Sequence, residues 1–375
     1  MAGIYIHIPF CRKKCIYCDF YSIGTKGLED AYIDAVIKEC SLRRNELRNS
    51  PLKTIYIGGG TPSLLSPEQI GKIVKGIRSI FSLKSLIEFT IEVNPDDVTQ
   101  EYISSIKELG INRVSMGIQS FVDSELTTIN RRHNSLQAIS AVDYIKNAGI
   151  DNISIDLIYG LPGQSLDSWL YSLSKAIALD VPHISCYSLS YEEGTRLYSL
   201  RERGLINECS EDDYISMYEV MVKELRNYGY EHYEVSNFAK NKKYSVHNSN
   251  YWNGEIYLGL GAAAHSYDGK SRSYNIANAK QYIDRISSSE LACEYENLSE
   301  YERYNEYIMI RLRTTWGVDL NELQRLFEDR FHRHFVTSVD KFIKNELMLL
   351  NGTNYRLTER GIMVSDMIIR DLMFG

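Results

Sequence analysis

Hydrophobic residues recur along the first half of the chain in two alternating patterns. Amphipathic stretches such as 28–47 and 135–149 have helical periodicity and lie between short runs of β-branched and aromatic residues. These runs predict strands at 3–8, 53–58, 87–93, 112–118, 152–158 and 183–189. Six β–α units of this kind predict a parallel sheet with right-handed crossovers. Because eight units close a full barrel, six predict an α/β fold with a partial (βα)6, TIM-like barrel.

In such a barrel, functional residues lie at the C-terminal ends of the strands. Polar or glycine-rich segments occupy those places in this chain, at 58–61, 92–95 and 117–120. Asp156 lies near the end of the next strand. We therefore expect these segments to line one site.

The pattern changes after the sixth strand. Residues 191–300 combine a helix near 211–228 with short strand-like runs, and we expect a mixed α/β extension that completes the site. Residues 301–375 have helices followed by a hairpin at 347–358, an order similar to that of winged-helix modules. The predicted domains are therefore a barrel at 1–190, the mixed extension and a winged-helix-like C-terminal domain.

The C-terminal region has local signals of its own. Asn351 and Gly352 predict the turn of the hairpin. Asp319 predicts the start of one helix, and Thr358 that of the last helix in the chain. Residues 301–375 hold 11 Lys and Arg against 11 Asp and Glu, whereas a wing that reads DNA would be basic. We therefore expect this domain to pack or to dock a partner.

The composition is that of an ordinary globular protein. Of 375 residues, 44% are hydrophobic and 24% are charged, and the net charge of −7 disfavours a nucleic-acid partner. No apolar run reaches the ~20 residues of a membrane span, so we expect at most peripheral membrane association. The opening segment MAGIYIHIPF is too short and too uncharged for a signal peptide. These features predict a cytoplasmic protein with reduced thiols.

Three of the seven cysteines lie close together. Cys11, Cys15 and Cys18 have the spacing C-x3-C-x2-C in a loop that follows a predicted strand. Four thiolates cover a [4Fe–4S] cluster fully, so three leave one iron with an open site. An open iron can chelate the amine and carboxylate of S-adenosylmethionine (SAM), and a reduced cluster can pass one electron to the sulfonium. The spacing therefore favours a [4Fe–4S] cluster with SAM as its partner.

Two other interpretations of this motif stay open. Zinc could bind with His7 or Asp19 as the fourth ligand, although structural zinc usually combines two separated ligand pairs. The three cysteines could also be free thiols of the protein interior, although so close a set on one loop is unusual. The dispersed cysteines are predicted to be structural; they are Cys40, Cys186, Cys209 and Cys293.

The cysteine loop, with Tyr17 before its last cysteine, resembles that of the radical SAM superfamily. Further motifs are similar to one branch of it, the oxygen-independent coproporphyrinogen III oxidases. In chain order they are GGGTPS (58–63), EVNPDD (92–97), GIQSF (117–121), NRRH (130–133) and DLIYGLPGQ (156–164). The resemblance covers nearly the whole chain. It implies a radical SAM barrel that holds a [4Fe–4S] cluster and SAM.

The resemblance also implies a role for each matching residue. Cys11, Cys15 and Cys18 would hold the cluster. The positions that match the first SAM are Tyr5, Gly59 and Glu92. The positions that match a second SAM are Gly60, Thr61, Gln119, Arg131 and Asp156. Taken alone, the glycines would indicate a tight turn, and the arginine and aspartate a surface ion pair.

Two departures separate the chain from the oxidase branch. Phe20 stands where the oxidases have a fourth cysteine, and Tyr5 lies nearly at the start, without their N-terminal extension. Both features resemble HemW-type haem chaperones. HNSNYW (247–252) resembles the haem-binding H-N-x-x-Y-W motif of that family, which implies haem as a ligand and His247 as its axial ligand. His265 has a weaker claim to that role.

The resemblance therefore favours a haem chaperone that binds haem, a cluster and SAM and delivers haem to respiratory haem proteins. The alternative is an enzyme, an oxygen-independent coproporphyrinogen III oxidase that forms protoporphyrinogen IX by radical decarboxylation of propionates. Gln119, Arg131 and Asp156 support the enzyme, and Phe20 disfavours it. A third alternative is a DNA-binding regulator with an iron–sulfur sensor, which the charge balance of 301–375 disfavours.

Overall fold

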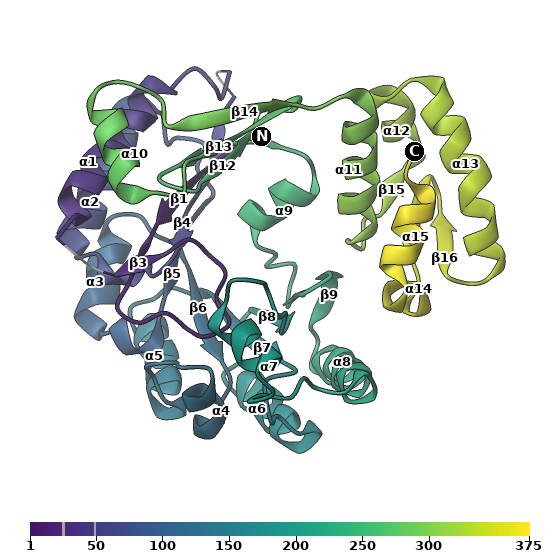
Figure 1. Cartoon of the computed structure of the whole chain (residues 1–375), viewed down its shortest axis with the longest axis horizontal. Helices are drawn as coiled ribbons and strands as arrows, with labels where there is room; N and C mark the ends of the chain where they lie inside the picture. The colour runs from purple at the N-terminus through teal and green to yellow at the C-terminus, as the bar shows by residue number, and fades with distance from the viewer. Residues whose placement is uncertain (25–26, 49) are drawn as a thin grey trace.

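The computed structural model describes residues 1–24, 27–48 and 50–375 (Figure 1). Within these residues, twelve strands form one sheet, and its six central strands are parallel. In their order across the sheet they are β1 (Ala2–Ile8), β4 (Leu52–Gly59), β5 (Glu88–Val93), β6 (Arg113–Gln119), β7 (Asn152–Tyr159) and β8 (His183–Ser188). All six strands that the sequence predicts are present, and the predicted α/β fold is confirmed.

Helices connect these strands and cover the outer face of the sheet (Figure 1). They are α1 (Glu29–Leu42), α2 (Pro67–Ile80), α3 (Gln100–Glu108), α4 (Asp123–Thr128), α5 (Ser135–Asn147) and α6 (Leu166–Ala178). Two 3-10 turns follow β4 and β5, namely η1 (Pro62–Leu64) and η2 (Pro95–Asp97), and a small pair of strands flanks the cysteine loop, β2 (Phe10–Cys11) and β3 (Ile23–Gly24). Capping boxes satisfy the first amides of α2 and α5, which begin after Ser66 and Asn134.

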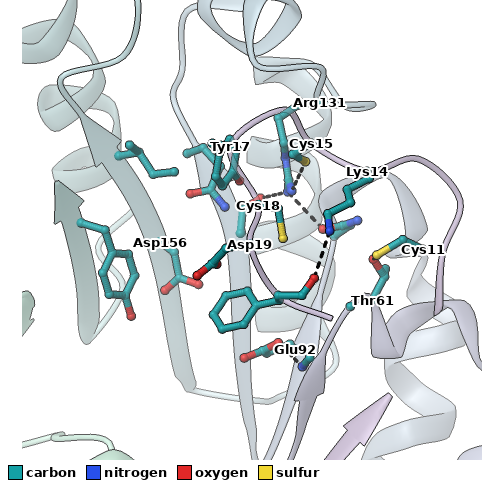
Figure 2. A pocket seen from close by; sticks show the side chains of 18 of the residues that line it. Cys11, Lys14, Cys15, Tyr17, Cys18, Asp19, Thr61, Glu92, Arg131 and Asp156 are labelled. Atoms are coloured by element: carbon teal, nitrogen blue, oxygen red, sulfur yellow. Dashed lines mark hydrogen bonds between the residues drawn. The ribbon is translucent and has the colours of Figure 1, made fainter. Parts of the chain in front are cut away.

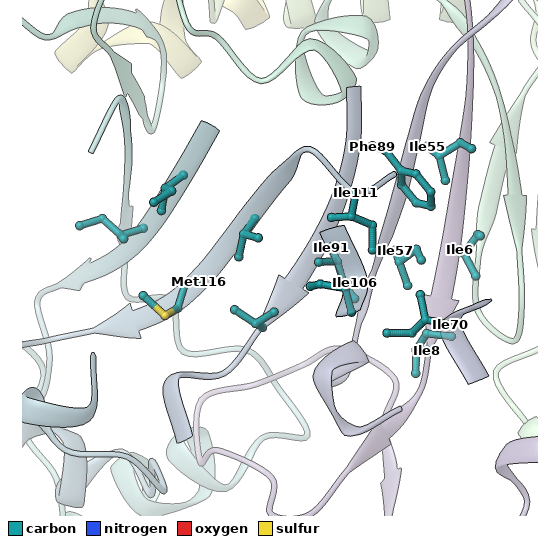
Figure 3. Packing of buried hydrophobic residues seen from close by; sticks show 14 of the residues in the cluster. Ile6, Ile8, Ile55, Ile57, Ile70, Phe89, Ile91, Ile106, Ile111 and Met116 are labelled. Carbon is teal, nitrogen blue, oxygen red and sulfur yellow. The ribbon is translucent and has the colours of Figure 1, made fainter. Parts of the chain in front are cut away.

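The two faces of the central sheet differ in polarity because side chains alternate along each strand. On the outer face, isoleucines such as Ile6, Ile57 and Ile91 pack with Ile70 of α2 and Ile106 of α3 (Figure 3). The inner face holds mainly polar side chains; they include Tyr5, Tyr56, Thr90, Glu92, Arg113, Ser115, Ser154, Asp156 and Ser185. The outer face therefore supplies the core, and the inner face is left for chemistry.

Residues 191–300 extend the same sheet at both edges. Beside β1 lie β11 (Ile256–Leu260), β12 (His265–Tyr267), β13 (Ser271–Asn275) and β14 (Cys293–Asn297), and beside β8 lie β10 (Asn237–Ala239) and β9 (Glu231–Glu234). The helices of this part are α7 (Arg196–Glu202), α8 (Glu211–Asn227), α9 (Val246–Trp252) and α10 (Ala279–Ser287). One hydrophobic cluster runs through the barrel and this extension. The boundary near residue 190 stays a prediction.

The C-terminal residues pack around a second hydrophobic cluster. Their helices are α11 (Glu300–Leu312), α12 (Leu320–Leu326), α13 (Asp329–Lys344), α14 (Glu359–Met363) and α15 (Ser365–Leu372). Their strands form a small sheet in the order β15 (Val318–Asp319), β17 (Asn354–Leu357) and β16 (Met348–Asn351). Arg272 of β13 and Glu306 of α11 form an ion pair of 2.7 Å that ties this domain to the large sheet.

Two predictions about the C-terminal domain are wrong in detail. Asn351 pairs with Asn354, so Gly352 and Thr353 make the hairpin turn in place of Asn351 and Gly352. Thr358 does cap a helix, because its side chain accepts from the amide of Gly361, but this helix is α14. Helix α15 follows it and is the last in the chain.

Candidate functional site

The three clustered cysteines lie in the loop that follows β1. Cys11 ends β2, and the amide of Cys18 donates to the carbonyl of Cys15 at 3.3 Å. All three half-buried thiols line one cavity of about 420 Å3 (Figure 2). Among the described residues, no three His, Cys, Asp or Glu side chains are close enough together to hold a single metal ion. The three thiols share the wall of one cavity.

Polar groups of the barrel contact two of these thiols. Arg131 Nη1 lies 3.5 Å from the sulfur of Cys15, and the hydroxyl of Thr61 lies 3.3 Å from the sulfur of Cys11. Burial raises the pKa of the Cys18 thiol to about 11, so this thiol needs a bound cation to stay deprotonated near neutral pH.

Glu92, at the end of β5, forms an acidic part of the cavity wall. Its carboxylate accepts a hydrogen bond of 2.7 Å from the hydroxyl of Tyr56 and one of 3.0 Å from the amide of Gly59. Burial raises the pKa of Glu92 to about 7, and these two hydrogen bonds oppose the rise. The hydrogen bonds fix the carboxylate so that it can bind a polar or cationic ligand group.

The glycine run after β4 brings the backbone close to the cysteine loop. Gly59 has φ +113°, a conformation that side chains rarely adopt. The amide of Gly60 donates to the carbonyl of Ile8 at 2.8 Å. A Cβ on Gly60 would lie 2.9 Å from the carbonyl oxygen of Phe10 and 3.0 Å from that of Ile8. The glycines thus make a tight turn that brings this backbone against the cysteine loop.

Gln119 and Arg131 bring unpaired polar atoms to the same cavity. Among the described residues, Oε1 of Gln119 and Nε of Arg131 are buried without a hydrogen-bond partner. Gln119 has φ +71°, a left-handed conformation where β6 ends. Arg131 is held in place, because its guanidinium donates to the carbonyl of Gly117 and, at 3.0 Å, to Oδ1 of Asn94. Buried polar atoms without partners are costly, so both side chains are suited to a polar ligand.

Asp156 lies on β7, opposite Gly117 in the register of the sheet. Burial raises its pKa to about 6, and a hydrogen bond from Ser185 and the charge of Arg113 oppose the rise. Figure 2 shows Asp156 and Glu92 on separate strands, both directed into the cavity. Two carboxyl groups that titrate near neutral pH therefore share the site with the cysteines.

The structure brings most of the predicted site residues together. The cavity is lined by Cys11, Cys15, Cys18, Gly59, Gly60, Thr61, Glu92, Gln119, Arg131 and Asp156. Tyr5 and His247 are not among its lining residues. The strand-end positions therefore converge as the barrel pattern requires, while the individual roles stay predictions.

Sequence reasoning missed several residues that line this cavity, among them Ser115 and Tyr187. Ser115 pairs with Glu92 across β5 and β6, so strand alternation could have indicated it. Asn94 belongs to the motif after β5, but nothing in its sequence context predicts that it accepts from Arg131. Tyr187 stands outside every motif.

A second and larger cavity, of about 840 Å3, lies between the large sheet and the C-terminal domain. We call it the tyrosine cavity, because its lining includes Tyr5, Tyr251, Tyr257, Tyr267 and Tyr307. Asp19 and Phe20 of the cysteine loop line both cavities. Phe20 is 62% exposed. We call the cavity that Cys11, Cys15 and Cys18 line the cluster cavity. The cluster cavity and the tyrosine cavity are neighbours, because they share these two residues.

His247 is buried in α9 and lines neither of these two cavities. Its Nδ1 lies 2.8 Å from the hydroxyl of Thr54, and its Nε2 lies 2.8 Å from the hydroxyl of Tyr251. The carboxylate of Glu88 accepts from the amides of Val246 and His247, both at 2.8 Å, and so holds the start of α9 against the sheet. Both ring nitrogens of His247 are thus engaged within the protein.

Comparison with known proteins shows the family and the fold. Residues 5–176 match the radical SAM superfamily, and residues 298–364 match the HemN C-terminal domain. The solved structure of coproporphyrinogen III oxidase (HemN) from Escherichia coli, a radical SAM enzyme, is similar with a TM-score of 0.84. The two sequences are 22% identical, and the match covers 99% of this chain and 90% of the HemN chain. The two proteins therefore share a fold.

Curated relatives are more similar in sequence. The heme chaperone HemW of Lactococcus lactis is 36% identical over 95% of this chain and 93% of its own length. The Bacillus subtilis protein of the same name is 38% identical over 89% of this chain and 88% of its own. The Mycobacterium tuberculosis protein, also named heme chaperone HemW, is 31% identical over 99% of this chain and 94% of its own length.

The partial barrel with a three-cysteine loop at its strand ends is that of a radical SAM protein, and this domain implies a [4Fe–4S] cluster and SAM as cofactors. Identity of more than 30% over nearly the full length narrows the assignment further. The chain belongs to the HemW family. The resemblance seen in the sequence is confirmed.

Proposed function

We propose that this protein is a haem chaperone that binds haem next to a [4Fe–4S] cluster and SAM. The observation that carries the proposal is that the tyrosine cavity lies beside the cluster cavity, with Asp19 and Phe20 in the wall of both. The name of the curated relatives, heme chaperone HemW, supports haem as the ligand. Haem is the cargo in this proposal, and the cluster and SAM are resident cofactors.

The residues of the smaller cavity fit those cofactors. Cys11, Cys15 and Cys18 would hold the cluster through their thiolates, and a reduced cluster with an open iron supplies one electron to the sulfonium of SAM. Glu92 accepts hydrogen bonds at a fixed position, and Arg131 offers a guanidinium that suits a carboxylate. The predicted second SAM, at positions that include Gln119 and Asp156, is part of this proposal.

We further propose that the acceptors are respiratory haem proteins and that the protein works in the cytoplasm, without a nucleic-acid partner. Docking to such acceptors would involve at most peripheral contact with a membrane. None of the helices in the described ranges is both long and apolar enough to cross a membrane.

A second function is supported by the cluster cavity itself. Gln119, Arg131 and Asp156 match positions of the oxygen-independent coproporphyrinogen III oxidases and line the same cavity as the cysteines. An enzyme of this kind would convert coproporphyrinogen III to protoporphyrinogen IX by decarboxylating two propionates. Phe20 in place of the fourth cysteine disfavours this alternative.

A haem titration of the anaerobically reconstituted protein tests the proposal. We expect a Soret band that saturates at one haem per chain. Absence of specific binding would reject the chaperone. In that case, anaerobic conversion of coproporphyrinogen III by the same preparation would establish the enzyme.

A further inference from the structure

We infer that the tyrosine cavity is the haem site, with the imidazole of His265 as iron ligand and Arg303 as a partner for a propionate. This inference rests on the proposed function, because it names the residues that would bind the proposed cargo. It differs from the expectation drawn from the HNSNYW motif, in which His247 is the ligand.

The tyrosine cavity has the size and lining that a tetrapyrrole needs. Its volume of about 840 Å3 lies within the range of ~300–1,000 Å3 that is usual for ligand sites. Aromatic side chains reach it from several elements: Tyr5 on β1, Tyr251 on α9, Tyr257 on β11 and Tyr307 on α11. Flat aromatic faces can pack against the large apolar surface of a porphyrin, and the tyrosine hydroxyls can form hydrogen bonds with its polar groups.

Two imidazoles line this cavity, and they differ in their hydrogen bonds. His7 is buried, with Nδ1 3.0 Å from the hydroxyl of Tyr5 and Nε2 2.9 Å from the carbonyl of Tyr21. His265, at the start of β12, is exposed, and its ring has no hydrogen-bond partner among the described residues. The pKa of His265 lies below its usual value because of partial burial and the nearby charge of Arg272. A neutral imidazole with free nitrogens is a common ligand of haem iron.

Two arginines at the same cavity offer partners for the carboxylates of haem, beside the acidic lining residues Asp19, Glu255, Glu306 and Glu322. Arg303 of α11 lines the cavity and has no ion-pair partner among the residues that the structure describes. Arg272 also lines it and is paired with Glu306 at 2.7 Å. Arginine binds carboxylates through parallel hydrogen bonds, so Arg303 can take a propionate without giving up an existing ion pair.

The motif residue His247 would act on this site through Tyr251. Its Nε2 lies 2.8 Å from the Tyr251 hydroxyl, and Tyr251 lines the tyrosine cavity. The two rings also meet edge to face, with their centroids 5.1 Å apart. We therefore assign His247 as a positioning residue: it orients Tyr251, while His265 contacts the iron.

The inference is tested by titrating the reconstituted protein with haem and, separately, with metal-free protoporphyrin IX. The variants are His265→Ala, His247→Ala and Arg303→Gln, and His332→Ala serves as a matched control because His332 is a partly exposed imidazole outside the cavity. His265→Ala should weaken haem binding more than about tenfold and shift the Soret band, while its affinity for protoporphyrin IX stays unchanged. His247→Ala should lower the affinity for both haem and protoporphyrin IX and keep the wild-type position of the Soret band.

Arg303→Gln should lower the affinity for haem and for protoporphyrin IX to the same extent, because both ligands have propionates. The inference is overturned if His265→Ala binds haem like the control, or if His247→Ala alone loses the histidine-ligated spectrum. Either of those results leaves the proposed function intact, since the wild-type protein still binds haem. Failure of the wild-type protein to bind haem would instead reject the proposed function.

Discussion

The imidazole of His247 and the hydroxyl of Tyr251 are 2.8 Å apart, and the tyrosine, not the histidine, lines the tyrosine cavity. The other ring nitrogen of His247 is 2.8 Å from the hydroxyl of Thr54, and the ring stacks on Tyr56 at 5.1 Å. His247 therefore joins α9 to the inner face of the sheet. The motif residue His247 is thus tied to its neighbours in the protein interior.

This relationship predicts that His247 matters for stability. His247→Ala should lower the free energy of unfolding by about 2–4 kcal/mol, because two buried hydrogen bonds and a stacked ring are lost. His265→Ala should change it by less than about 0.5 kcal/mol, because His265 is exposed. Urea denaturation of both variants without ligand measures the difference. Equal stability of the two variants would show that His247 is not a structural link.

The cysteine loop predicts a cluster that depends on three thiols. Substituting Cys11, Cys15 or Cys18 with Ala should abolish the iron and sulfide bound after anaerobic reconstitution. Cys209→Ala is the control, because Cys209 is a half-buried thiol outside the cavity and should retain the full iron content. Loss of iron in the control, or its retention in all three loop variants, would contradict the assignment.

The glycine turn after β4 predicts a steric effect. Gly60→Ala should destabilise the protein by about 1–3 kcal/mol, because the new Cβ would meet the carbonyl oxygens of Ile8 and Phe10 at 3.0 and 2.9 Å. Gly24→Ala is the control, since a Cβ there has no neighbour within 4 Å among the described residues. Thermal unfolding of both variants gives the comparison. A neutral Gly60→Ala would show that the turn can relax.

Glu92 predicts a pH dependence of stability in the protein without cofactors. Burial raises its pKa from 4.5 to about 7, so between these values the folded chain holds a proton that the unfolded chain has released. The contribution of Glu92 is therefore favourable at low pH and is lost as the pH rises through about 7. Asp156, whose pKa is raised to about 6, acts in the same direction.

Glu92→Gln removes this titration. The variant should gain stability relative to the wild-type protein as the pH rises from about 5 to 8, as followed by urea denaturation at each pH. Glu101→Gln, on the exposed side of α3, is the control and should keep a constant difference. A Glu92→Gln difference that does not change with pH would show that the carboxyl group is ionised throughout.

The barrel and the cluster cavity could be predicted because local patterns specify them. Alternating apolar residues such as Ile55 and Ile57 mark β4, and the parallel sheet then brings all strand ends to one edge. The spacing of Cys11, Cys15 and Cys18 favoured a [4Fe–4S] cluster without tertiary information, and their role as its ligands stays a prediction. The hairpin turn was misplaced by one residue because Asn351 pairs with Asn354 across it.

The tyrosine cavity could not be predicted, because it forms from segments far apart in the chain. Tyr5, His265 and Arg303 come from β1, β12 and α11, and no spacing in the sequence joins them. The burial of His247 was also hidden, since a motif gives the identity of a residue and not its surroundings. The partners that fix it, Thr54 and Tyr251, belong to different elements.

The most direct test of the proposed function compares two activities in one preparation. The reconstituted protein is titrated with haem, and in parallel it is incubated anaerobically with coproporphyrinogen III, SAM and a reductant. A haem chaperone predicts a Soret band that saturates at one haem per chain and no protoporphyrinogen IX. Turnover of coproporphyrinogen III without saturable haem binding would contradict the chaperone and identify the protein as an oxidase.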